Sequence, residues 1–241
     1  MTCFCLPLKV YLIRLTSFIL LIVLLLACKK PNEVVPPVLE PKIKSFTEGA
    51  YTLIITNNDG SVNTTIRDKM VKVFFQVYPK LVNRFNPQAP TTVYFIIDPT
   101  YTGVAYATGG ATVYYSANYL KSNPNDIDVV THEVMHVVQA YANGLGWLTE
   151  GLADYARFTY GIDNTAANWA LPPYAPGQNY TDSYRVTARF LVWLDKKYSP
   201  AVINELDANL RAGTYQADVW VKLTGKTLND LWLNYSQNPT W

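Results

Sequence analysis

The sequence contains little cysteine and little histidine. Of its 241 residues, only three are cysteines and two are histidines. All three cysteines lie within the first 28 residues, so the rest of the chain cannot form a disulfide scaffold. Cysteine-based redox chemistry and cysteine-ligated metal sites are therefore excluded after residue 28.

Charged residues are also few, at 16% of the chain, and their signs balance. Lys9 and Arg14 are the only charged residues before Cys28, and removing these two from the 20 basic residues leaves 18 against 18 acidic ones. A chain with no net charge and no basic cluster lacks the electrostatic footprint that binds phosphate backbones, so we expect no nucleic acid partner. An apolar content of 49% indicates one folded domain instead.

The N-terminus has the pattern of a bacterial secretory signal. Lys9 and Arg14 precede an apolar run over residues 18–27, which is too short to span a bilayer comfortably. Ala27 before Cys28 resembles a lipobox, in which the cysteine is lipidated and becomes the mature N-terminus. A signal cleaved nearby, or an uncleaved anchor with Cys28 as an ordinary apolar residue, is the alternative.

These features divide the chain into three parts. Residues 1–27 are predicted to be a lipoprotein signal peptide, residues 28–41 a proline-rich tether, and residues 42–241 the folded domain. We expect the domain to lie outside the cytoplasm, as a bacterial cell envelope lipoprotein in the periplasm or on the surface. Its contact with the membrane would then be through the N-terminal lipid only.

The sequence pattern of the domain predicts an α+β fold. β-branched and apolar runs predict strands at 51–56, 92–97 and 112–116, with an amphipathic helix over 63–84 between the first two. From residue 125 onward the pattern is helical, with helices expected at about 126–142, 148–159, 182–197, 200–211 and 227–236. We therefore predict a small N-terminal mixed sheet with a helix, followed by a mainly helical half.

Both histidines of the chain belong to one motif. His132 and His136 lie four residues apart, with Glu133 directly after the first, in the segment HEVMH. On a helix this spacing places both imidazoles on one face, where they can bind a single Zn²⁺. Glu133 lies about 100° round the helix and would reach a water molecule as general base. The alternative is a pair of hydrogen-bonded core histidines with Glu133 in solvent.

A third ligand is expected on the next helix. The segment 143–146 breaks the first helix, and a tight reversal would bring the second helix back across it. We assign Glu150 as the third ligand of one Zn²⁺ per chain, and Asp154, one turn later, as the acceptor that orients a ligand histidine. One alternative exchanges the two roles, with Asp154 as the metal ligand and Glu150 as the acceptor. In another alternative, both carboxylates lie on a solvent-exposed face of the helix and bind no metal.

The segment HEVMHVVQ followed by WLTEGLADYAR resembles the basic secretory proteins of plants and bacteria, a family grouped with the glutamate-zincin metallopeptidases. The likeness extends from the strand near Tyr51, through residues 103–106, to residues 183–191, although the chain after residue 28 is not basic and its link from His136 to Glu150 is slightly shorter than is usual there. The resemblance implies a zincin-like fold and a peptidase activity, without identifying a substrate.

The sequence thus predicts a zinc-dependent peptidase acting on a peptide or protein. Tyr184, after a loop over 164–180, is the candidate donor to the oxyanion, with a packing role as its alternative. The strand 112–116 is expected at the cleft edge, where an extended peptide would add to the sheet. The alternative functions are a non-catalytic zinc-containing cell-surface module that binds peptide or glycan, and a metal-free envelope scaffold.

Overall fold

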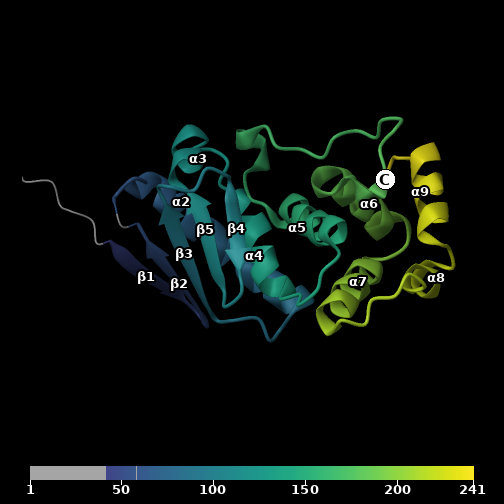
Figure 1. Cartoon of the computed structure of the whole chain (residues 1–241), viewed down its shortest axis with the longest axis horizontal. Helices are drawn as coiled ribbons and strands as arrows, with labels where there is room; N and C mark the ends of the chain where they lie inside the picture. Colours follow the sequence, from purple (N-terminus) through teal and green to yellow (C-terminus); the bar gives the residue numbers. More distant parts are fainter. Residues whose placement is uncertain (1–41, 58) are drawn as a thin grey trace, which may run out of the picture. The chain divides into compact units, whose positions relative to one another are not determined.

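The computed structural model describes residues 42–57 and 59–241. The predicted signal peptide, Cys28 and the tether lie outside the described residues, so those predictions stay predictions. The described part forms one compact unit in which the five strands and one long helix come first and the other helices follow (Figure 1). No helix among the described residues has the length and apolar character needed to cross a bilayer.

A five-stranded mixed sheet makes up the N-terminal half, as predicted. The strands are β1 (Ile43–Glu48), β2 (Tyr51–Thr56), β3 (Thr92–Asp98), β4 (Ala105–Thr108) and β5 (Thr112–Ser116), in the spatial order β1-β2-β3-β5-β4. The three central strands β2, β3 and β5 run parallel, and β1 and β4 pair antiparallel at the two edges. The sequence predicted the three central strands and missed both edges.

One face of the sheet is buried against helices. Alternate residues of β2, Leu53 and Ile55, are almost fully buried, as is Phe95 of β3. The helix α2 (Thr64–Phe85) packs there, and the rings of Phe74 and Phe95 meet edge to face with centroids 5.8 Å apart. This packing follows from the period of two in the strands and the helical period in α2.

The edge of the sheet beside the helical half is β4. The strand β5, which the sequence placed at the edge, is hydrogen-bonded to β3 on one side and to β4 on the other. That prediction was wrong because β4 consists of only four half-exposed or exposed residues and has no apolar run to mark it. The unpaired hydrogen-bonding edge therefore belongs to Ala105–Thr108.

The helical half follows in the order α3 (Ala117–Ser122), α4 (Val129–Gln139), α5 (Gly146–Tyr160), α6 (Tyr184–Lys197), α7 (Pro200–Ala212), α8 (Val219–Thr224) and α9 (Leu228–Gln237). Two short 3-10 turns, η1 (Asn164–Ala167) and η2 (Tyr180–Asp182), lie in the segment between α5 and α6. In Figure 1, α4 lies beside the sheet, α5 beside α4, and α6 beyond α5. Rings of α6 and α9, among them Phe190 and Trp232, pack together and hold the last helix in place.

Candidate metal centre

The helix α4 carries both histidines on one face. His132 and His136 point their Nε2 atoms toward each other at a separation of 3.2 Å, and ten of the eleven residues of α4 are buried. The helix ends at Gln139 because Ala140 adopts a left-handed conformation with φ 46°. The chain then reverses and returns as α5, as the sequence predicted from the glycines in this link.

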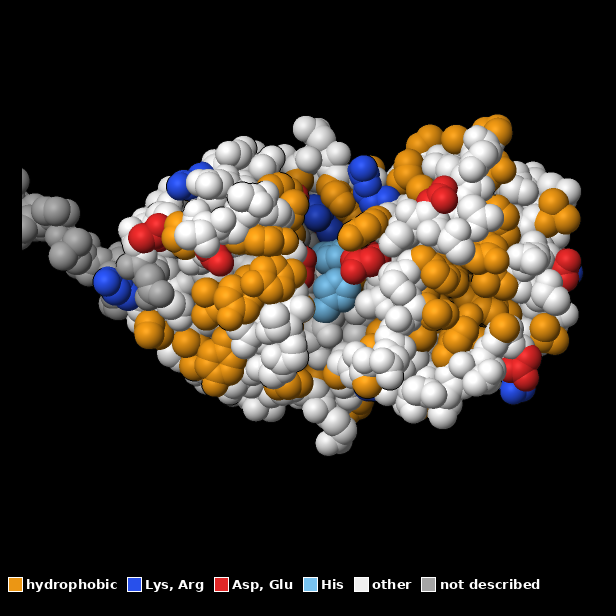
Figure 2. Space-filling view, viewed as in Figure 1, with side chains coloured by type: hydrophobic (Ala, Val, Ile, Leu, Met, Phe, Trp, Pro, Cys, Tyr) orange, Lys and Arg blue, Asp and Glu red, His pale blue; other side chains and the backbone are white. Residues whose placement is uncertain are grey.

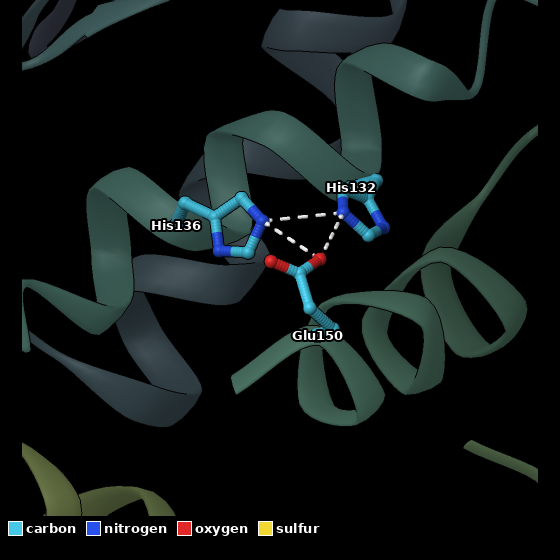
Figure 3. A group of neighbouring side chains, drawn as sticks. All are labelled: His132, His136 and Glu150. Atoms are coloured by element: carbon cyan, nitrogen blue, oxygen red, sulfur yellow. Dashed lines mark hydrogen bonds and ion pairs between the residues drawn. The ribbon is translucent and has the colours of Figure 1, made fainter. Parts of the chain in front are cut away.

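The first turns of α5 bring Glu150 to the histidines. Its Oε2 lies 3.2 Å from Nε2 of His132 and 3.6 Å from Nε2 of His136 (Figure 3). One atom from each of the three side chains lies within 4.8 Å of the others. The consecutive helices α4 and α5 thus place around one point three atoms that could ligate a metal ion.

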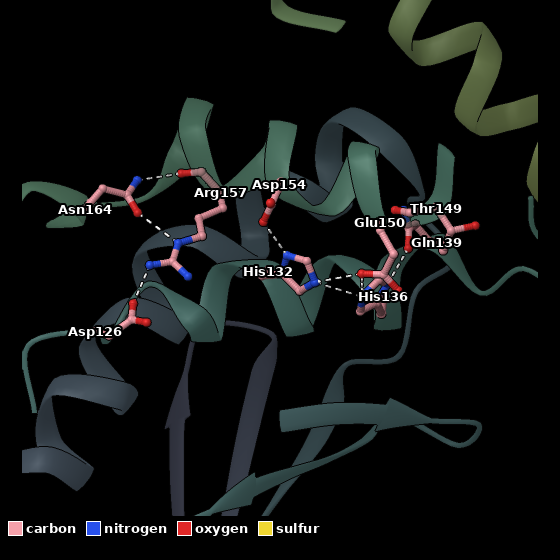
Figure 4. A network of polar contacts seen from close by, with 9 residues as sticks. All are labelled: Asp126, His132, His136, Gln139, Thr149, Glu150, Asp154, Arg157 and Asn164. Carbon is pink, nitrogen blue, oxygen red and sulfur yellow. Dashed lines mark hydrogen bonds and ion pairs between the residues drawn. The ribbon is translucent and has the colours of Figure 1, made fainter. Parts of the chain in front are cut away.

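The far nitrogen of each imidazole ring is held by a polar partner. Nδ1 of His132 lies 2.7 Å from a carboxylate oxygen of Asp154, and Nδ1 of His136 lies 2.7 Å from the amide oxygen of Gln139 (Figure 4). The amide of Gln139 in turn donates to the carbonyl oxygen of Thr149 at 2.9 Å. Gln139 was not predicted from the sequence, although its place three residues after His136 on the same helix face was the available signal.

These contacts determine which atoms of the rings are free. A carboxylate and an amide oxygen can only accept, so both Nδ1 atoms carry hydrogen and both Nε2 atoms of neutral rings present lone pairs. When both rings are neutral, two lone pairs and the Glu150 carboxylate converge on one point with no donor among them. The donor set of two imidazoles and one carboxylate fits Zn²⁺.

The pKa shifts of His132 and Glu150 show that the metal-free site favours positive charge. Burial alone lowers the pKa of His132, but its hydrogen bonds with Asp154 and Glu150 outweigh burial and raise the pKa to about 10. Burial alone would raise the pKa of Glu150, but hydrogen bonds with His132 and His136 bring it to about 2. The site thus holds a proton where a cation would otherwise bind.

Glu133 lies next to His132 but takes no part in this cluster. Its side chain is buried, and its Oε2 has no hydrogen-bond partner in the described part of the chain. Burial raises the pKa of Glu133, against the opposing effect of the two histidines. An unsatisfied buried carboxylate is costly, and such groups are found where they serve a reaction or bind a ligand.

Tyr184 lies above the histidines and is 55% exposed. Its ring is nearly parallel to that of His132, with centroids 6.2 Å apart. The negative charge of Glu150, followed by partial burial, raises the pKa of Tyr184. Ser183 and Tyr184 both have positive φ, at 66° and 45°, so a strained backbone holds this ring at the start of α6.

These side chains open into a cleft of about 1290 Å³. Figure 2 shows the hollow, with the histidine side chains visible inside it. The strand β4 lines one wall, and the segment before α6, including Trp169, lines part of the other. Arg157 also lines the cleft, and it donates to Asp126 and to Asn164 (Figure 4). Its guanidinium lies over the ring of Trp169.

The fold is similar to that of solved zinc metallopeptidases. A two-domain M1 zinc metallopeptidase mutant bound to L-tryptophan matches with a TM-score of 0.50 and 16% identity, over 82% of this chain and 51% of that chain. The M1 zinc metallopeptidase of Deinococcus radiodurans gives a TM-score of 0.45 at 16% identity, over 82% and 51% of the two chains. The chain spans about half the length of these structures, and the likeness to the first of them shows the zincin-like fold.

The sequence itself matches a family over most of its length. No relative among the curated proteins matches the chain. The family model described as "peptidase of plants and bacteria", the model of the basic secretory proteins, matches residues 45–235. This range includes His132, His136 and Glu150, and it confirms the family resemblance read from HEVMHVVQ and WLTEGLADYAR. The chain therefore belongs to the peptidase family of plants and bacteria.

Proposed function

We propose that the chain is a zinc-dependent peptidase that hydrolyses peptide bonds in the cleft between β4 and the helical half. The observation that carries the proposal is the convergence of three acceptor atoms, from His132, His136 and Glu150, in an open cleft beside the unpartnered carboxylate of Glu133. Membership of a peptidase family and the fold of zinc metallopeptidases support it.

His132, His136 and Glu150 would hold one zinc ion. When bound, zinc supplies a Lewis acid that polarises a carbonyl group and lowers the pKa of a water molecule toward neutrality. Asp154 and Gln139 fix the tautomers of the two histidines, so the Nε2 lone pairs face the ion without reorganisation. Three protein ligands leave a position open, which is typical of a catalytic site rather than a structural one.

Glu133 is the proposed general base. Its carboxylate has no competing hydrogen-bond donor among the described residues, so it is available to accept the proton of the attacking water. Burial raises its pKa, which makes the protonated form accessible at the next step. The same side chain would then deliver that proton to the nitrogen of the departing amine.

Tyr184 and β4 are proposed to hold the substrate. The phenol ring lies over His132 and is exposed to the cleft, so its hydroxyl can donate to the oxygen that becomes negative when water attacks. The free edge of Ala105–Thr108 offers backbone donors and acceptors to an extended peptide. The binding site would therefore accept a stretch of unfolded chain.

The location outside the cytoplasm remains a separate proposal. Lys9, Arg14 and the apolar run over 18–27 support a secretory signal, and Ala27-Cys28 supports lipidation at Cys28. Mass spectrometry of the membrane fraction of a bacterial host would show a lipid-modified N-terminal Cys28. An unmodified N-terminus at another residue would reject this assignment and leave the peptidase proposal intact.

The decisive test combines zinc content with hydrolysis. Purified wild-type protein, Glu133→Gln and Glu150→Ala would be analysed for zinc and incubated with an unstructured protein. We expect one zinc per chain in wild type and in Glu133→Gln, hydrolysis in wild type alone, and weakened zinc binding in Glu150→Ala. The exposed Glu205 provides a matched control, because Glu205→Gln removes a carboxylate outside the cleft.

Each result has a distinct meaning. Full hydrolysis by Glu133→Gln would reject its role as the base. Zinc without hydrolysis in wild type would favour the non-catalytic binding module, and absence of zinc would reject the whole assignment.

A further inference from the structure

We infer that Arg185 forms a subsite that binds a carboxylate group of the substrate, at the end of the cleft lined by Trp169. This inference rests on the proposed peptidase function and names a chemical feature of its substrate. The inference follows from the charged side chains that line the cleft. Almost all of them form ion pairs with side chains of opposite charge.

The other charged groups along the described lining are engaged or assigned. Arg157 donates to Asp126, which also accepts from the hydroxyl of Tyr119. The carboxylates of Glu150 and Asp154 are bound to the histidines. Glu133 is the buried group that we assign as base. None of these is available to bind a charged group of a substrate.

Arg185 differs from all of them. It is exposed, lines the cleft directly after Tyr184, and forms no ion pair with any of the described residues. Its one hydrogen bond among them is a long one, 3.4 Å from a terminal nitrogen to the carbonyl oxygen of Ala170. Most of its donors are therefore free to bind a ligand, and Figure 2 shows basic side chains at the rim of the hollow that holds the histidines.

The chemistry of the cleft gives Arg185 a specific partner. A guanidinium group presents a planar fork of donors that matches a carboxylate with two parallel hydrogen bonds. Glu150 and Asp154 are already paired with the histidines, and Glu133 adds an unpaired buried carboxylate, so the described side chains at the centre of the cleft offer no free cation to a further negative charge. A substrate carboxylate would therefore bind away from the centre, beside Arg185 and the ring of Trp169, where its charge is compensated.

Two parts of a peptide carry this group, the C-terminus and the side chains of aspartate and glutamate. Fluorogenic decapeptides would distinguish them, with one position at a time occupied by glutamate or glutamine, each made as a free acid and as a C-terminal amide. Preference for the free acid identifies the C-terminus, and preference for glutamate over glutamine at one position identifies an acidic side chain.

The test compares wild type with Arg185→Gln, Arg185→Lys and Lys197→Gln. Lys197 lies at the other end of α6 and is exposed outside the cleft, so its substitution removes the same charge without touching the subsite. We expect wild type and Lys197→Gln to favour the carboxylate-bearing peptide about tenfold in kcat/KM, mainly through KM. Arg185→Gln should lose this preference, and Arg185→Lys should recover part of it.

Binding to the Glu133→Gln background gives a readout that does not depend on turnover. Fluorescence anisotropy with the same peptides should show the same preference, and its loss when Arg185→Gln is added. Equal binding of the paired peptides by wild-type Arg185, or a preference that survives Arg185→Gln, would overturn the inference. Absence of zinc and hydrolysis in wild type would instead reject the peptidase proposal, and the binding comparison would still decide the role of Arg185.

Discussion

Asp154 and Glu150 hold the two nitrogen atoms of the same imidazole, that of His132. The distance is 2.7 Å from Asp154 to Nδ1 and 3.2 Å from Glu150 to Nε2. The two carboxylates lie one turn apart on α5, so a single helix contacts both nitrogen atoms of the ring. The geometry places Asp154 on the side of the ring that faces away from His136.

The first prediction concerns the different roles of these two carboxylates. Asp154→Ala should weaken zinc binding by about 10- to 100-fold, because it removes the acceptor that orients His132. Glu150→Ala should weaken it further, since it removes a ligand atom. Competition with a fluorescent chelator measures both affinities. Unchanged affinity in Glu150→Ala together with loss in Asp154→Ala would reverse the assignment, and Glu205→Gln serves as the control.

The second prediction concerns the hydroxyl group of Tyr184. Tyr184→Phe keeps the ring over His132 and removes only the donor, so kcat should fall by about 100-fold or more with little change in KM or zinc content. Tyr94→Phe is the matched control, because Tyr94 is an exposed tyrosine of β3 that does not line the cleft. A kcat equal to that of wild type in Tyr184→Phe would show that the ring only packs.

The third prediction concerns the backbone that carries this ring. Ser183 has φ 66° and ψ −179°, a conformation that glycine adopts freely, and its side chain makes no capping hydrogen bond to α6. Ser183→Gly should therefore raise the free energy of unfolding by about 1 kcal/mol, the net of relieved strain and the greater entropy of unfolded glycine. Denaturant titration measures the free energy of unfolding. Ser183→Val should lower this free energy. A loss of stability in Ser183→Gly would show that the backbone at Ser183 is not strained.

The sequence predicted the meeting of His132, His136 and Glu150 because local geometry determines most of it. The helical spacing fixes the first two, and the short reversal between α4 and α5 leaves few places for the third. Their role as zinc ligands is proposed here on that geometry. Gln139 was missed although its spacing from His136 was a signal, because an amide at the end of a helix has many possible partners and the spacing alone does not single out one of them.

The ends of α4 show a second limit of prediction from the sequence. The sequence predicted a helix over 126–142, whereas α4 spans Val129–Gln139. Asp128 ends the loop before α4, and its carboxylate accepts from the backbone nitrogens of Ile162 and Asp163, which lie more than 30 residues later. A contact so distant in the chain has no local signal. The edge strand β1 was missed for a related reason, since its pairing with β2 stabilises a segment that is half exposed or exposed.

The fourth prediction concerns removal of the metal. Zinc that binds the folded chain alone would stabilise it by about 4 kcal/mol when its free concentration is 1,000 times Kd. Treatment with a chelator should therefore lower Tm by several degrees, and restored zinc should raise it again. In Glu150→Ala the shift should be much smaller. An identical Tm with and without chelator would contradict binding at this cluster.

The fifth prediction concerns Gly151, which follows Glu150 where α5 crosses α6. A Cβ atom at Gly151 would lie 2.2 Å from Cγ2 and 2.7 Å from Cβ of Thr187. Thr187 is fully buried, and its hydroxyl donates to the carbonyl oxygen of Tyr180 at 2.6 Å. A rotation of its side chain away from Gly151 would break this buried hydrogen bond. Gly151→Ala must therefore separate the two helices.

We expect Gly151→Ala to lower the free energy of unfolding by about 1–3 kcal/mol, and to weaken zinc binding because Glu150 moves with the backbone. Gly146 is the matched control, since a Cβ there meets nothing within 4 Å at the start of the same helix. Gly146→Ala should be neutral or slightly stabilising, because it reduces the entropy of the unfolded chain. Denaturant titrations with and without zinc separate the two effects. Equal stability of the two alanine variants would show that α5 and α6 do not pack as closely as the contact at Thr187 requires.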